Sequence, residues 1–187
     1  IVISLGDPAG IGTEIILKAL GSKYLNKNIQ PLIVGCKNNI YETYTKLINH
    51  GIDNIPDPEK LDIIDIPLER KIIPGIVDEH TGSASFQWLL NATNMLLEGK
   101  AKALVTAPIS KIAWHKAGHK FAGQTELLGK LTNKKTSMLF TAISPNNGWR
   151  FNTLLATTHI PINKINDALT KELIRYKLDT LLNFCRK

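Results

Sequence analysis

Short apolar runs alternate with longer stretches of helical period, and no other feature of this sequence constrains the fold as strongly. Each run ends in turn residues or a helix-capping residue, as a strand buried in a parallel sheet usually does. The runs cover residues 1–5, 31–35, 61–66 and 103–106. Because helices are expected between them, this order predicts an α/β layered fold with a largely parallel sheet.

The stretches between the runs carry helix boundaries as well as apolar spacing. Thr13 is suited to cap the first helix, and Thr81 or Ser83 to open the longest one. Further helices are expected over residues 39–49, 110–116, 125–131 and 170–184. Two strands, over residues 137–142 and 151–157, flank a turn and predict a local antiparallel hairpin.

The charge balance narrows the classes of partner. The chain has 187 residues with 23 basic and 16 acidic side chains, a net charge of +7. Its lysines are scattered without a basic run or interleaved aromatic residues, so no nucleic acid is expected, whereas a small phosphorylated substrate or a merely solvated surface fits. No apolar run approaches the roughly 20 residues of a membrane span, so no membrane association is expected.

Two cysteines, Cys36 and Cys185, are too few for a disulfide scaffold or a zinc cluster. No basic leader precedes the first apolar run. We therefore expect a reducing, cytoplasmic location.

A glycine-rich segment at residues 6–14 joins the first strand to its helix. Its glycines would let the backbone approach a ligand, and the helix N-terminus would present free amides to an anion. The spacing is neither a dinucleotide fingerprint nor a Walker loop. A tight strand-to-helix turn that needs glycine is the alternative.

Two further segments are suited to an anion. Lys111 follows the fourth apolar run and could hold a phosphate or carboxylate, or simply lie on the surface. Gln124 and Thr125 open a helix, where the Thr125 hydroxyl and nearby amides could bind an anion with the Gln124 amide as a neutral donor. Simple capping by Thr125 is the alternative.

The histidines give weaker indications of a metal. His115 and His119 have the spacing of two ligands on one helix face, but Gly118 is expected to end the helix between them. His159 is expected to end the second hairpin strand, where a neutral imidazole would suit a divalent metal. A hydrogen-bonded structural histidine is the alternative there.

Five of these segments occur together in a fixed order, at residues 6–14, 81–85, 103–111, 118–126 and 157–161. In this respect the chain resembles the PdxA family of 4-hydroxythreonine-4-phosphate dehydrogenases, from Ile1 to about Ala168. The resemblance implies a two-domain, three-layer α/β/α fold like that of isocitrate and isopropylmalate dehydrogenases, with an interdomain cleft. Family members are longer, so residues 1–121 would form the first domain and residues 122–187 the beginning of the second.

The resemblance also implies an activity. The family oxidises 4-phosphohydroxy-L-threonine with NAD or NADP in pyridoxal phosphate biosynthesis, and the product loses carbon dioxide to give 3-amino-2-oxopropyl phosphate. It implies a homodimer with the active site at the interface and a divalent metal (Zn, Mg or Co) on three histidines, of which His159 matches the first. Gln124 and Thr125 match the substrate-contacting pair.

Two residues depart from the family pattern. The family usually has histidine where this chain has Gln124, which can bind but cannot carry charge or transfer a proton. Thr13 often is proline, and both residues suit a helix start. A paralogous dehydrogenase of erythronate or threonate 4-phosphate, and a truncated chain without catalytic activity, remain alternatives.

Overall fold

The computed structural model describes residues 1–26 and 28–186. Contacts between residues divide the chain into two compact units, Ile1–Lys134 and Lys135–Lys187. Each unit is described separately below.

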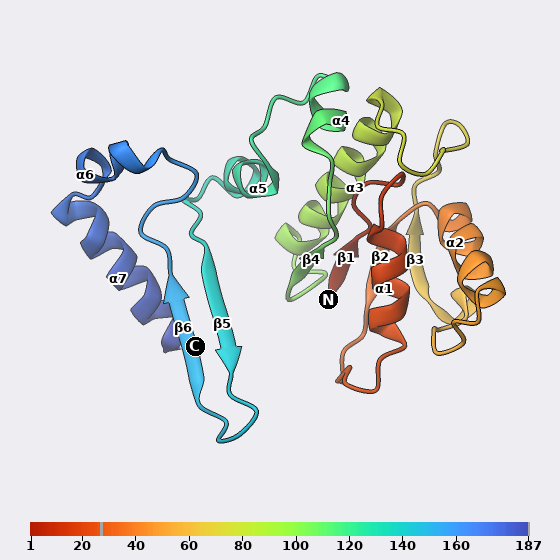
Figure 1. Cartoon of the computed structure of the whole chain (residues 1–187), viewed down its shortest axis with the longest axis horizontal. Helices are drawn as coiled ribbons and strands as arrows, with labels where there is room; N and C mark the ends of the chain where they lie inside the picture. The colour runs from red at the N-terminus through yellow and green to blue at the C-terminus, as the bar shows by residue number, and fades with distance from the viewer. Residues whose placement is uncertain (27, 187) are drawn as a thin grey trace. The chain divides into compact units, whose positions relative to one another are not determined.

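The first unit contains a four-stranded parallel sheet (Figure 1). Its strands are β1 (Val2–Ser4), β2 (Leu32–Gly35), β3 (Asp62–Asp65) and β4 (Leu104–Thr106). Their order across the sheet is β3-β2-β1-β4, and every neighbouring pair is parallel. In the register, Ile3 pairs with Ile33 on one side and with Val105 on the other. The predicted α/β fold with a parallel sheet is thus confirmed.

Helices cover both faces of this sheet. They are α1 (Gly12–Leu20), α2 (Lys37–Asn49), α3 (Glu79–Leu97), α4 (Lys111–Lys116) and α5 (Gln124–Thr132), with a 3₁₀ turn η1 (Pro58–Lys60) before β3. The chain steps from β1 to β3 in one direction and then returns past β1 to β4. With right-handed crossovers, this reversal places α3 on the face opposite α1 and α2. Every residue of β1 is buried, as expected for a strand covered on both faces.

Two buried tryptophans anchor α3 and α4. Trp88 lies in the core under the sheet and donates its indole N–H to the Ile66 carbonyl oxygen over 3.2 Å. Trp114 donates its indole N–H to the Ser85 hydroxyl over 2.8 Å. Both indole rings therefore bury a large apolar surface while their polar atoms stay hydrogen-bonded.

Two helices begin earlier than the sequence predicts. Thr13 does not cap α1 but lies inside it, and its hydroxyl donates to the Asn39 side chain over 2.7 Å. Helix α3 is capped by Asp78, whose carboxylate accepts from the Thr81 backbone N–H over 2.9 Å. The Thr81 hydroxyl in turn accepts from the Asp78 N–H, which completes a capping box. Thr81 is thus the third residue of the helix and not its cap.

The second unit consists of the predicted antiparallel hairpin and the helices that follow it. Strands β5 (Leu139–Ile143) and β6 (Arg150–Leu154) are followed by a 3₁₀ turn η2 (Ile162–Lys164), α6 (Ile165–Ala168) and α7 (Lys171–Cys185). No residue that the structure describes in this unit is buried. The described part of the unit therefore has no buried core of its own.

His159 does not end a strand as expected. Pairing of β6 with β5 stops at Leu154, opposite Leu139, so His159 falls in the loop beyond the hairpin. It is exposed and has a φ of 57°, a left-handed conformation that few residues other than glycine adopt. The expectation of a strand-end position for this imidazole was wrong.

Helix α5 belongs to the first unit. Leu127 of α5 is 2% exposed and packs in a cluster with Leu89 of α3 and Trp114 of α4. The boundary after residue 121 concerns the domains of a whole family member, and it stays a prediction. None of the helices among the described residues is long and apolar enough to cross a membrane.

Candidate active site

The loops after β1 and β4 leave neighbouring strands toward opposite sides of the sheet. Such a switch point at the carboxyl edge is where open α/β sheets place their ligands. Here the two loops are joined tightly, since the Asp7 N–H donates to the Pro108 carbonyl oxygen over 2.9 Å. A Cβ on Gly6 would lie 2.3 Å from that same oxygen, and Gly6 has a φ of +73°. Packing alone therefore explains Gly6, as the tight-turn alternative expects.

Asp7 is a buried carboxylate within this loop. One of its oxygens accepts from the Ala9 backbone N–H over 2.9 Å, which fixes the turn. Burial raises the pKa of Asp7, opposed by the Ala9 hydrogen bond and assisted by the negative charge of Asp78. Asp7 thus holds the loop, and its ionised form is disfavoured by the surroundings.

The start of α5 is tied to the same edge. Gly123 occupies the N-cap position without a side-chain hydrogen bond, so Thr125 does not cap this helix, and the capping alternative is wrong. The Gln124 side-chain amide donates to the Ala107 carbonyl oxygen, in the loop after β4, over 3.1 Å. Free backbone amides at this end of a helix attract anions.

Lys111 lies beside that helix start. A Cβ placed on Gly123 would be 3.5 Å from the Lys111 Cε and 3.8 Å from its Nζ. The Glu126 carboxylate is near the same point, at 3.4 Å, yet no ion pair forms with Lys111 among the described residues. The sequence-predicted residues Lys111, Gln124 and Thr125 are therefore brought together in one unit.

His115 and His119 do not form a metal site. Gly118 ends the helix between them with a φ of +83°. The His119 ring stacks on Phe86 with centroids 3.6 Å apart, and burial lowers its pKa. The His115 ring lies against the Phe121 carbonyl oxygen at 3.2 Å. Packing and backbone contacts account for both histidines.

The described residues do not complete a metal centre around His159. A catalytic zinc site usually has three protein ligands. No group of three or more histidine, cysteine, aspartate or glutamate side chains placed to hold a metal occurs in the described part of the chain. A single exposed imidazole does not fit a divalent metal by itself.

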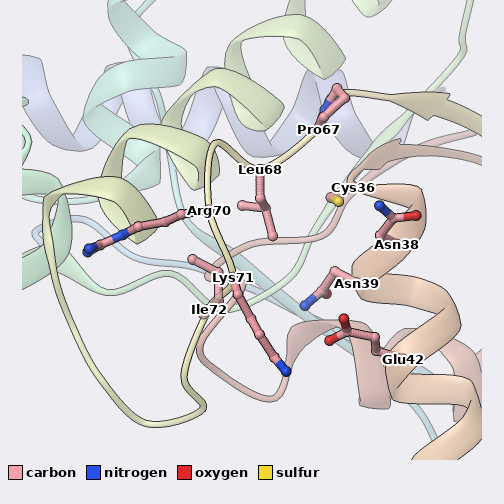
Figure 2. Close-up of a pocket in the computed structure, with 9 residues that line it drawn as sticks. All are labelled: Cys36, Asn38, Asn39, Glu42, Pro67, Leu68, Arg70, Lys71 and Ile72. Carbon is pink, nitrogen blue, oxygen red and sulfur yellow. The ribbon is translucent and has the colours of Figure 1, made fainter.

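Sequence reasoning missed a second concavity at the carboxyl edge, between the start of α2 and the loop after β3 (Figure 2). It has a volume of about 290 Å³, near the lower end for small-molecule pockets. Its lining residues are Cys36, Asn38, Asn39, Glu42, Pro67, Leu68, Arg70, Lys71 and Ile72. Asn39 also connects it to the glycine-rich segment through Thr13. The neighbouring cations Arg70 and Lys71 were the feature of the sequence that could have indicated it.

A parallel α/β unit with an uncapped helix N-terminus and an unpaired lysine at its carboxyl edge defines a class, the α/β proteins that bind anionic ligands at this edge. The chain belongs to one family within that class. It matches the family described as pyridoxal phosphate biosynthetic protein PdxA over residues 25–187. The resemblance stated from the sequence motifs is thereby confirmed.

Similar proteins cover the whole chain. The 4-hydroxythreonine-4-phosphate dehydrogenase of Synechococcus sp. (strain RCC307) is 49% identical over all of the chain and 56% of its own length. The D-threonate 4-phosphate dehydrogenase of Pectobacterium atrosepticum is 35% identical over 92% of the chain and 54% of its own length. The chain spans about half the length of the curated relatives it matches.

Solved structures agree on the fold. The crystal structure of 4-hydroxythreonine-4-phosphate dehydrogenase from Klebsiella pneumoniae superposes with a TM-score of 0.82 at 30% identity. The match covers 100% of this chain and 58% of that one. The α/β arrangement described above is therefore part of a larger enzyme fold in that protein.

Proposed function

We propose that the full-length protein is an NAD(P)-dependent dehydrogenase of 4-phosphohydroxy-L-threonine. The observation that carries this proposal is the 49% identity to a 4-hydroxythreonine-4-phosphate dehydrogenase along all of the chain. The carboxyl-edge cluster of Lys111, Gln124 and Thr125 supports it, because a helix N-terminus beside a lysine suits a phosphorylated substrate.

The reaction removes a hydride from C3 of the substrate and a proton from its C3 hydroxyl, which yields 2-amino-3-oxo-4-phosphooxybutanoate. A bound nicotinamide cofactor supplies the hydride acceptor. The bond between C1 and C2 then breaks, with loss of carbon dioxide, to give 3-amino-2-oxopropyl phosphate. In pyridoxal phosphate biosynthesis this ketone would be passed on as a phosphorylated amino ketone.

Residues of this chain would bind and orient the substrate in this scheme. Gln124 and Thr125 form the substrate-contacting pair at the start of α5, and Lys111 places a positive charge beside them. Holding a reactant in one orientation is a major part of catalysis in such enzymes.

The proposal for the whole enzyme includes parts outside the described geometry. We propose a two-domain, three-layer α/β/α fold of the isocitrate and isopropylmalate dehydrogenase type, with the active site in the interdomain cleft at a homodimer interface. His159 would be the first of three metal ligands. Since His159 has no companion donors among the described residues, no step of the reaction is derived through the metal. A cytoplasmic location remains part of the proposal.

The second candidate function is oxidation of D-threonate 4-phosphate or its erythronate isomer. The 35% identity to the enzyme from Pectobacterium atrosepticum favours it less strongly than the 49% identity favours the first candidate. The full-length protein should be assayed for NADH or NADPH production on both substrates side by side. Activity on the sugar acid phosphate alone would reject the first candidate.

A further inference from the structure

The Gln124 side chain is used at one end and free at the other. Its Nε2 donates to the Ala107 carbonyl oxygen over 3.1 Å. Its Oε1 is fully buried and has no hydrogen-bond partner among the described residues. A buried amide oxygen left unpaired is costly, so such atoms usually meet water or a ligand.

The hydrogen bond to Ala107 fixes which end of the amide is which. A carbonyl oxygen only accepts, so the atom facing Ala107 must be the NH₂ group and the unpaired atom must be the oxygen. The sequence alone suggested the Gln124 amide as a donor toward the ligand. In the structure the backbone already uses this donor, and the acceptor is what remains.

We propose that Gln124 acts toward the substrate as a hydrogen-bond acceptor, so that it selects a hydroxyl or ammonium group of the substrate and not its phosphate or carboxylate. This inference rests on the proposed function and assigns the polarity of one contact within it. The anionic groups are then left to partners of opposite character, the Lys111 ammonium and the free amides of α5.

A pair of ligands tests this polarity in the full-length protein. One is 4-phosphohydroxy-L-threonine, and the others are its analogues with the C2 amino group replaced by hydroxyl or by hydrogen. Calorimetry gives the dissociation constant of each for the wild type and for Gln124→Met, which keeps the length of the side chain but has no amide. Removing the acceptor should weaken binding of a ligand that offers the matching donor by about tenfold.

The pattern across the ligands decides the donor. If the C2 group is the donor, Gln124→Met weakens the amino and hydroxyl ligands and changes the hydrogen analogue less than about threefold. If the C3 hydroxyl is the donor, an analogue lacking that hydroxyl is the insensitive one. Equal weakening of every ligand, including inorganic phosphate, would overturn the inference and leave the proposed function standing. Failure of the wild type to bind any of the phosphorylated ligands would overturn both.

A second measurement does not depend on the variant. The side-chain NH₂ protons of Gln124 in the wild type should be protected from exchange before the substrate binds and should stay so afterwards. A large shift of these protons on addition of inorganic phosphate would show that the amide donates to the anion, which contradicts the proposed polarity.

Discussion

Gly6 and Pro108 approach so closely that a Cβ on Gly6 would lie 2.3 Å from the Pro108 carbonyl oxygen. The Gly6→Ala variant should therefore lose more than about 2 kcal/mol of unfolding free energy, from the clash and from the left-handed φ of +73° together. Urea denaturation measures the loss. Gly75→Ala is the matched control, because Gly75 has a φ of +79° with nothing within 4 Å of its Cβ position. Equal losses in both variants would show that the contact between the loops is not the cause.

The capping box of α3 gives a second prediction. Asp78→Ala should destabilise the first unit by about 1 kcal/mol, because the Thr81 N–H loses its acceptor. Asp78→Asn keeps an acceptor oxygen and should lose less. Thermal or urea unfolding distinguishes the two variants, and an alanine variant as stable as the wild type would contradict the role of the cap.

The stability contributed by Asp78 should depend on pH. The Thr81 N–H, with the Arg70 guanidinium, holds the pKa of Asp78 below its usual value of 3.8. A lowered pKa means that the unfolded chain takes up the proton first, so this stability is present above pH 3.8 and is lost as the pH falls through the folded-state pKa. Unfolding of the wild type and Asp78→Asn across this acid range should converge at the lowest pH. A constant difference would contradict the prediction.

Asp7 should show the opposite dependence. Burial raises its pKa, so the folded state holds the proton more tightly and the ionised carboxylate opposes folding once the pH passes the folded-state pKa. Asn at position 7 retains an oxygen for the Ala9 N–H but carries no charge. We expect the stability of Asp7→Asn relative to the wild type to rise as the pH increases from acid toward neutral. A relative stability that falls over this interval would contradict the effect of burial.

Lys111 provides a prediction about binding. Lys111→Met in the full-length protein should raise KM for the phosphorylated substrate about threefold to tenfold, with kcat little changed, because one charged contact to an anion is lost. Lys120→Met, at an exposed lysine after α4, is the matched control. If both variants have the same KM, Lys111 does not contact the substrate.

The sequence predicted the framework more completely than the details at its edges. The runs ending near Ser4, Gly35, Asp65 and Thr106 gave all four parallel strands, because buried strands need continuous apolar residues. The order of the strands could not be derived, since it depends on tertiary packing. Thr81 was mistaken for a cap because it is a capping partner, and Asp78 lies outside the apolar pattern that marks the helix.

The site divides in the same way. Lys111 and Gln124 could be placed at the carboxyl edge from their positions after a strand and before a helix. The polarity of the Gln124 amide could not, because it depends on Ala107, a residue far away in the sequence. His159 was misplaced because a strand that extends past its pairing partner cannot be distinguished from a loop by apolar residues alone.

Steady-state formation of NADH or NADPH by the full-length protein with 4-phosphohydroxy-L-threonine tests the proposed function most directly. We expect turnover that requires this substrate, stops on addition of a chelator and returns when a divalent metal is restored. A folded, metal-supplied protein that forms no reduced cofactor with this substrate would contradict the proposed function.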